Sequence, residues 1–153
     1  MLKAFFITLG TSMVPILELR GGIPVGIAAG LSWEMAMLAA VIGNLIPVPF
    51  IIIFIRKIFA FMRRHIPKLG TLVDSLERRA KAKGELVHRY ELLGLIILVA
   101  VPLPGTGAWT GSLVAALLDI RLRRALPCIV AGVLIAAAVV TAACLGVVHI
   151  AGL

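Results

Sequence analysis

An apolar block of 27 residues, Leu92 to Leu118, constrains this chain most, because Pro102-Leu103-Pro104-Gly105-Thr106-Gly107 interrupts its centre. A single helix of that length would be about 40 Å long, but prolines and glycines in this order end a helix. The interruption leaves arms of ten and eleven residues, each about 15 Å long or half a bilayer core. The block therefore predicts a helical hairpin that enters a membrane and returns to the same side.

Two other blocks are long enough to cross a membrane. Met35 to Ile55 has 21 uncharged residues and Ala125 to Val148 has 24, and about 20 are needed for a hydrocarbon core of about 30 Å. Asn44, Pro47 and Pro49 predict a kink in the first of these helices. Hydrophobic residues make up 61% of the chain and charged residues 14%, against about 25% charged residues in soluble domains. These values exclude a soluble globule and predict an all-α integral membrane protein.

The charges are concentrated in one segment. Residues 56–89 hold ten of the fifteen basic residues and three of the seven acidic ones. A basic segment beside long apolar blocks is typical of a cytoplasmic face and not of nucleic-acid binding. Residues 56–91 and 119–124 are therefore expected to be cytoplasmic. An amphipathic helix on the inner membrane surface is predicted from apolar residues at helical spacing, namely Leu69, Leu72, Val73, Leu76 and Ala80.

The first apolar block, Ala4 to Leu31, has a similar build, with a predicted break at Glu18-Leu19-Arg20-Gly21-Gly22-Ile23-Pro24. One long crossing is an alternative to a hairpin here. A weak internal repeat favours the hairpin, because Gly22-Ile23-Pro24-Val25-Gly26 lies 85 positions before Gly107-Ala108-Trp109-Thr110-Gly111. With one crossing between the copies, the repeats would be inverted, as in transporters that bind substrate at the midplane between broken helices.

The predicted organisation is a single multi-pass domain of the inner (plasma) membrane, with both termini outside. The first repeat covers residues 1–55, with a re-entrant hairpin at 4–31 and a transmembrane helix at 33–55. The basic segment 56–91 follows. The second repeat covers residues 92–148, with a re-entrant hairpin at 92–118 and a transmembrane helix at 124–148.

Glu18 and Arg20 are the sharpest candidate functional residues, because the hairpin would place both near membrane mid-depth. A charge there costs about 2.5 to 3.5 kcal/mol unless it is paired or hydrated. Glu18 is a candidate for accepting and releasing a proton, and Arg20 for holding an anionic head group, bidentately if this is a phosphate. A structural pair that pins the tip, or an ordinary interfacial turn, is the alternative.

The second tip has no ionisable group, but its glycines permit close approach and its backbone amides can face an anion where the following half-helix begins. Trp109 either stacks on a ligand or packs against the opposite hairpin. Glu91, beside Tyr90, is a second candidate for proton relay. The predicted substrate-binding set is Arg20, Gly21, Gly22, Gly105, Thr106, Gly107 and Trp109.

Histidine and cysteine positions indicate neither a metal site nor a catalytic nucleophile with a base. Cys128 and Cys144 lie sixteen positions apart in one apolar run, about 24 Å if helical, which excludes a disulfide within it. We therefore expect no enzyme activity, no cofactor and no metal.

At the two tip motifs, 18–24 and 102–111, the sequence resembles the family of small multidrug export proteins, distant relatives of the DedA superfamily. The resemblance implies two facing re-entrant hairpins, each followed by a spanning helix. It also implies a function similar to that of DedA relatives, as proton-coupled transporters of polyprenyl-phosphate lipid carriers, or of more distant eukaryotic relatives, as lipid scramblases. DedA proteins carry an arginine motif at the second tip, whereas this chain has no arginine between Glu91 and Asp119.

The leading expectation is a secondary transporter, coupled to protons, that moves an amphipathic substrate such as an anionic lipid or a lipid-carrier phosphate. Export of lipophilic cations, with Glu18 as the acidic binding residue, is one alternative. An unenergised scramblase or a structural membrane module is another. The expected partners are membrane lipids and a second copy of the chain, because four short elements can hardly enclose a cavity alone.

Overall fold

The computed structural model describes residues 1–65, 67–103 and 105–151, except for the side chains of residues 63, 67–69, 83–91, 148 and 151. Every regular element in these ranges is an α-helix, which confirms the all-α prediction. The helices are α1 (Leu2–Met13), α2 (Glu18–Ala28), α3 (Trp33–Leu45), α4 (Pro47–His65), α5 (Pro67–Ala100), α6 (Ala108–Leu117) and α7 (Leu122–Ala151).

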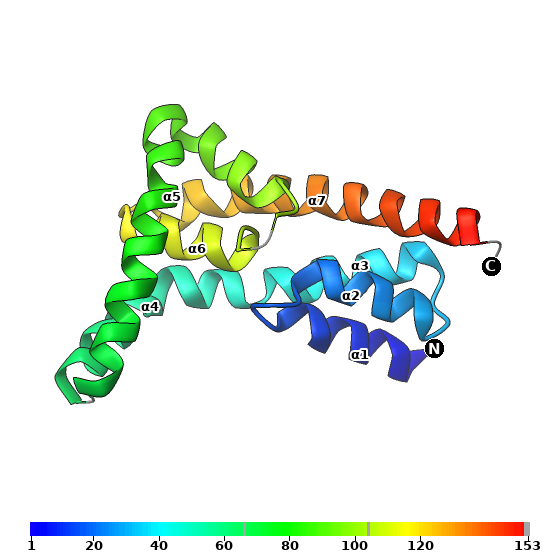
Figure 1. Cartoon of the computed structure of the whole chain (residues 1–153), viewed down its shortest axis with the longest axis horizontal. Coiled ribbons are helices and arrows are strands. Elements are labelled where there is room, and N and C mark those ends of the chain that lie inside the picture. The colour runs from blue at the N-terminus through cyan, green and yellow to red at the C-terminus, as the bar shows by residue number, and fades with distance from the viewer. Residues whose placement is uncertain (66, 104, 152–153) are drawn as a thin grey trace.

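Most of the helices lie along the long axis of the molecule, and α5 begins across one end of them (Figure 1). The hairpin α1–α2 lies at the end that holds both termini. The last part of α5 turns back and forms a second hairpin with α6 at the opposite end, so that the tips of the two hairpins meet near the middle of the molecule (Figure 1).

Two apolar stretches are long enough to cross a membrane, as the sequence predicts. One runs from Trp33 to Met62 through α3 and α4, and the other from Leu122 to Val147 in α7. The first is interrupted at Ile46, where α3 ends and α4 begins with Pro47. This is the region in which proline was expected to disturb the helix, because its nitrogen cannot donate the hydrogen bond to the preceding turn.

The predicted break of the first hairpin at residues 18–24 is wrong. The chain leaves the helix at Val14–Leu17, and α2 begins at Glu18 with a φ of 47°. Gly22 lies inside α2 because α1 packs closely there: a Cβ at Gly22 would stand 1.8 Å from the Ser12 Oγ. The glycines thus serve helix packing, and Pro15 stands in the turn instead.

The second break falls where it was expected, since α5 ends at Ala100 and α6 begins at Ala108. The boundary expected at residue 91 is different, however, because α5 runs without interruption from the basic segment into the hairpin. Val73 and Ala80 are buried, in agreement with the amphipathic pattern, whereas Leu72 is exposed.

The two long apolar stretches approach the hairpins almost backbone to backbone. A Cβ at Gly43 of α3 would lie 2.2 Å from the Leu9 carbonyl oxygen of α1, and one at Gly132 of α7 would lie 2.9 Å from the Ile96 oxygen of α5. Asn44, beside the first contact, is fully buried, and its side-chain atoms have no hydrogen-bond partner among the described residues. The interhelical bond expected of an apolar-span asparagine is therefore not found there.

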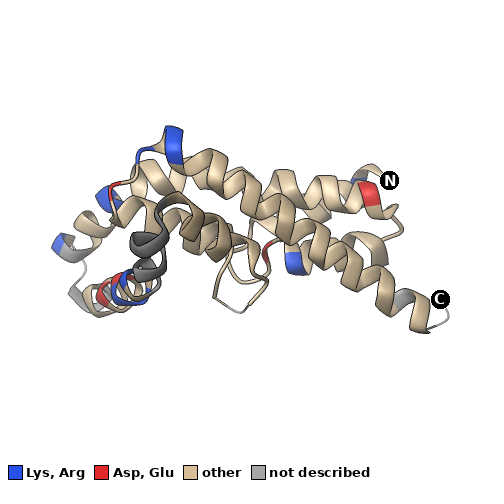
Figure 2. Ribbon diagram, turned by 90° about the horizontal axis from the view of Figure 1, so that it is seen from above, with Lys and Arg blue, Asp and Glu red and all other residues tan. Residues whose placement is uncertain are grey.

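The basic parts of the chain lie at one end of the molecule. Arg56 at α4 forms an ion pair with Asp119 in the turn between α6 and α7. Figure 2 shows a group of Lys and Arg residues at this end, away from both termini. The two segments expected on the same membrane side thus share one end of the protein.

We expect Gly43→Ala to lower the thermal unfolding temperature of the detergent-solubilised protein, measured by circular dichroism. The added methyl group must push the Leu9 backbone away, and overpacking of this kind costs about 1–3 kcal/mol.

Gly10→Ala is the matched control, because nothing lies within 4 Å of a Cβ at Gly10 in α1. It should leave the unfolding temperature unchanged or raise it, since alanine is the better helix former by about 1 kcal/mol. Equal destabilisation by both variants would contradict the close contact.

Candidate functional site

The two hairpin tips are joined through Glu18, a side chain that is only 3% exposed. Its Oε1 accepts a hydrogen bond of 3.1 Å from the backbone N–H of Trp109 in the first turn of α6. The α6 N-cap residue, Gly107, has no side chain to cap this helix end. Glu18 therefore supplies from the other hairpin the carboxylate that the exposed amides and the positive end of the helix dipole favour.

Gly107 is required by this contact. A Cβ there would stand 1.9 Å from the Glu18 Oε2, and the backbone has φ 118° and ψ −167°. This conformation is essentially restricted to glycine. The position thus combines a backbone that only glycine adopts with space that the carboxylate fills.

Arg20 is bound by two backbone carbonyls and one side-chain hydroxyl of the second tip. Its guanidinium donates through Nη1 to the Leu103 carbonyl oxygen, and through Nη2 to the Thr106 Oγ1 at 2.9 Å and the Val101 oxygen at 3.3 Å. These acceptors follow the C-terminal end of α5, where the helix dipole favours a cation. Glu18 and Arg20 form no ion pair with each other in the described part of the chain. Each charge is instead stabilised by a different end of the second break.

Trp109 adds a hydrogen bond that the second hairpin donates to the first. Its indole Nε1–H donates a 3.2 Å hydrogen bond to the Met13 carbonyl oxygen at the end of α1. Trp109 thus contacts the opposite hairpin directly, which is one of the two roles considered for it. Ligand stacking on its ring stays a prediction.

The remaining sequence-predicted site residues lie in different surroundings. The backbone amides expected to face a bound anion hold the chain's own carboxylate, that of Glu18, so a ligand at this place would have to displace it. Gly21 and Gly22 lie within α2, and Gly22 faces Ser12 of α1. Gly105 is exposed in the loop, with a φ of 76°. The Glu91 side chain lies outside the side chains that the structure describes.

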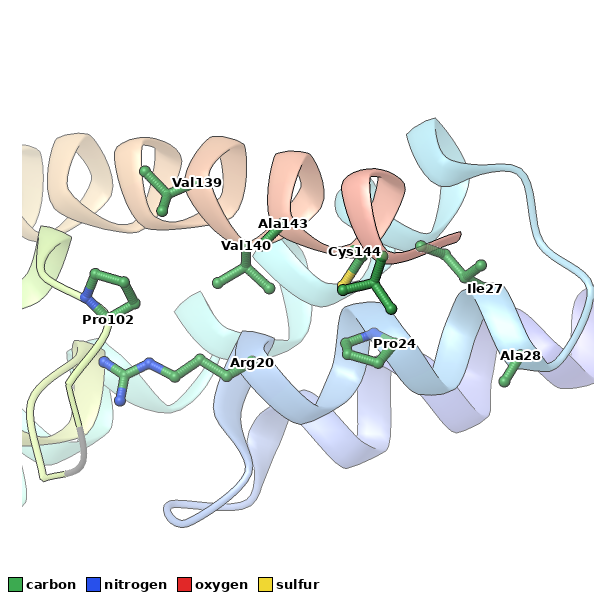
Figure 3. A pocket seen from close by; sticks show the side chains of 10 residues that line it. Arg20, Pro24, Ile27, Ala28, Pro102, Val139, Val140, Ala143 and Cys144 are labelled. Carbon is green, nitrogen blue, oxygen red and sulfur yellow. The ribbon is translucent and has the colours of Figure 1, made fainter. Parts of the chain in front are cut away.

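A groove of about 740 Å³ begins at Arg20 and runs between α2 and the C-terminal half of α7 (Figure 3). Apart from Arg20, the described lining side chains are apolar or thiol-bearing. They are Pro24, Ile27, Ala28, Pro102, Val139, Val140, Ala143, Cys144 and Val147. An elongated apolar wall with one cation at its end suits an amphipathic molecule better than a polar one.

Sequence reasoning missed most of this groove. The α7 residues of its wall belong to an apolar run that is indistinguishable by composition from a lipid-facing surface. Pro24 was the available signal, because proline inside a helix leaves the carbonyl of the residue four positions earlier without its donor. That residue is Arg20, so the interruption coincides with the charged end of the groove.

The fold and the groove define a helical membrane protein with two apolar spans and a site suited to a small amphipathic molecule. Residues 18–139 match the family described as "Putative small multi-drug export protein", and the chain belongs to this family. The matched region starts at Glu18, the first residue of α2, and includes the second tip. No curated protein and no solved structure matches the chain.

We expect Gly107→Ala to lower the unfolding temperature strongly, because it adds backbone strain of about 1–3 kcal/mol and pushes the Glu18 carboxylate off the amides of α6. Gly30→Ala is the control: its φ is 86°, yet nothing lies within 4 Å of a Cβ there. Thermal unfolding of the two variants separates backbone strain from loss of the tip contact, and the prediction fails if Gly107→Ala is no worse than Gly30→Ala.

The two native cysteines provide a direct test of the groove. Cys144 lines it, whereas Cys128 is buried in the core. A membrane-impermeant thiol reagent should therefore label Cys144 in proteoliposomes, measured by mass spectrometry, and leave Cys128 unlabelled. Equal protection of both thiols would show that water does not enter the groove.

Proposed function

We propose that this protein exports small amphipathic molecules across a membrane and binds them in the groove between α2 and α7. The observation that carries the proposal is an apolar groove that ends on one guanidinium beside the contact between the hairpin tips. Its volume of about 740 Å³ lies within the range of about 300–1,000 Å³ found for small-molecule sites. The family description supports export as the direction and membrane transport as the activity. Transport needs no chemical conversion of the substrate.

The charge of the groove favours an anionic substrate. Arg20 is its one charged lining residue among those described. The hydrogen bonds of Arg20 to the described residues leave its Nε–H and one Nη1–H for a ligand. These two donors lie on different edges of the guanidinium, so each can bind one phosphate or carboxylate oxygen. A lipid-carrier phosphate therefore fits better than a lipophilic cation. A cation would need the Glu18 carboxylate, which already accepts a hydrogen bond from the Trp109 amide.

In the proposed membrane arrangement both hairpins are re-entrant and their tips meet at mid-depth. Non-helical backbone at that depth is tolerated only where protein or water surrounds it, and the bonds between the tips meet that requirement. The basic end would face the cytoplasm, and both termini the outside of an inner membrane. The two hairpins with their spanning helices would form inverted repeats. The relation to the DedA superfamily and a homodimer stay predictions.

Glu18 offers a route for coupling to protons. An ionised carboxylate forms a strong, charge-assisted bond with the Trp109 amide, and protonation weakens such a bond. A proton on Glu18 would thus loosen the contact that holds the tips together. Glu91 stays a second candidate for proton transfer. A scramblase would move lipid without any such coupling.

The charge preference is tested in proteoliposomes of phosphatidylcholine and phosphatidylglycerol, with farnesyl phosphate as an amphipathic anion and ethidium as a lipophilic cation. We expect farnesyl phosphate to move and its half-saturating concentration to rise about ten- to a hundredfold in Arg20→Gln, as expected for losing a charged hydrogen bond of about 1.5–3 kcal/mol. Arg20→Lys should be intermediate, because it keeps the charge and loses the fixed, planar donors of the guanidinium.

Arg123→Gln is the control, because Arg123 carries the same charge outside the groove lining. Movement of ethidium but not of farnesyl phosphate would contradict an anionic substrate.

Proton coupling is tested by Glu18→Gln, because glutamine keeps an oxygen for the Trp109 amide but does not titrate. Farnesyl phosphate uptake driven by an imposed pH gradient should fall to the rate seen without a gradient, while the unfolding temperature changes little. Glu18→Ala should lose the uptake driven by the pH gradient and should also unfold at a lower temperature. If the wild-type rate is the same with and without a gradient, coupling is disproved and an unenergised scramblase is favoured.

A further inference from the structure

The two halves of the chain correspond in a register of 89 residues, not 85. Helices α3 and α7 begin at Trp33 and Leu122. Helices α2 and α6 end in the same hydrogen-bond motif, with left-handed residues at Gly30 and Asp119. Leu31 N–H donates to Gly26 O at 3.0 Å, and Ile120 N–H to Ala115 O at 2.9 Å, the pattern of a Schellman cap. All of these pairs are 89 positions apart.

Burial follows the same register. Five buried positions of α3 have buried counterparts in α7, each 89 positions later. Gly43 and Gly132, the two close-approach glycines of the spanning helices, are one such pair. Gly22 and Gly111, which pack on α1 and α5, are a further pair. The buried pairs are Ala36 and Ala125, Ala39 and Cys128, Ala40 and Ile129, Gly43 and Gly132, and Asn44 and Val133.

The contact between the two tips lies on the approximate two-fold axis that would relate the two halves. Glu18 and Gly107 are counterparts in this register, and they touch each other, as equivalent residues do on such an axis. Arg20 and Trp109 are also counterparts. Trp109 donates to the Met13 carbonyl, and Arg20 donates to carbonyls on both sides of Pro102, the counterpart of Met13. The hairpins point at each other from opposite ends (Figure 1), so the repeats run in opposite directions.

The halves differ in how the short helix of each half packs against the long apolar helix of the other half. The groove separates α2 from α7, with Ile27 and Val140 in its walls. Their counterparts, Ala116 of α6 and Ile51 of α4, are 4% and 8% exposed, and α6 packs against α4. The space between the short helix and the long apolar helix is thus open between α2 and α7 and closed between α6 and α4.

We propose that a second groove opens between α4 and α6 when the first one closes, and that it binds the same amphipathic substrate from the end that carries the basic residues. Two halves of equivalent build can exchange conformations at a small cost in free energy. The walls of the second groove would be Trp109, Leu113 and Ala116 on α6 and Ile51, Phe54 and Ile55 on α4. This inference rests on the proposed function for the identity of the substrate.

The second groove differs chemically from the first at its inner end. An indole, Trp109, stands where the first groove has the guanidinium of Arg20. The second site would therefore bind the apolar part of a substrate and lack a charged anchor within its own walls. An anionic head group is held more tightly in the first groove, which extends from Arg20 to Ala28 and Val147 (Figure 3), at the end of the molecule that holds both termini (Figure 1).

Ala116→Cys, in the full-length chain with Cys128→Ala, tests the inference in proteoliposomes. Ile27→Cys and the native Cys144 both line the first groove and can be bridged across it with a bifunctional maleimide. An impermeant methanethiosulfonate added from the basic end should then label Cys at 116 at least about tenfold faster than in the unbridged protein, a shift worth about 1.4 kcal/mol in the opening equilibrium. Excess farnesyl phosphate should slow that labelling.

Ala115→Cys is the matched control, because Ala115 is a buried neighbour whose counterpart, Gly26, packs on Thr8 of α1 and not on the groove. The inference is overturned if Cys at 116 labels no faster than Cys at 115 after bridging, even if the unbridged protein transports farnesyl phosphate. If bridging increases labelling but farnesyl phosphate neither slows it nor is transported, exchange of the two grooves stands, and the proposed substrate and its binding to the second groove are wrong.

Discussion

The structure depends on the way in which two apolar hairpins accommodate a carboxylate and a guanidinium between them. The two charges are not paired with each other. Glu18 binds the amide end of α6, and Arg20 binds carbonyls beyond the end of α5. A broken helix exposes an excess of donors on one side of the break and of acceptors on the other. The first hairpin thus provides the two charges that the break in the second hairpin requires. At low dielectric, the polar groups of either tip would lack hydrogen-bond partners without the other tip.

This contact also explains the position of the groove. Arg20 must reach the second tip, and Pro24, one turn further along α2, removes the donor for its carbonyl. The polar end of the groove therefore lies at the tip contact, and its apolar wall follows α2 towards the termini. The same guanidinium belongs to the packing and to the site. A ligand head group would contact the element that holds the hairpins in place, so binding and opening are linked by geometry.

The sequence was sufficient for features that depend on length and composition. Two apolar runs of spanning length and the break at residues 102–107 are found where they were expected. The first break was misplaced because glycines that let α1 pack on α2 look the same in a sequence as glycines that end a helix. The same glycines suggested a repeat register of 85 residues, about one helical turn short. The partner of Glu18 is a backbone amide, which no residue pattern can reveal.

The ion pair at the basic end has a consequence for how the two halves respond to their surroundings. Arg56 and Asp119 are 55% and 71% exposed, and exposed pairs of this kind contribute about 0–1 kcal/mol and weaken as salt rises. Asp119 has no ionic counterpart in the first half, where Gly30 occupies the same turn. Changes in ionic strength at the basic end therefore affect a contact between α4 and the α6–α7 turn that has no equivalent in the first half. In a membrane, the salt and lipid composition at that end would thus act on one of two halves that share the same helix arrangement.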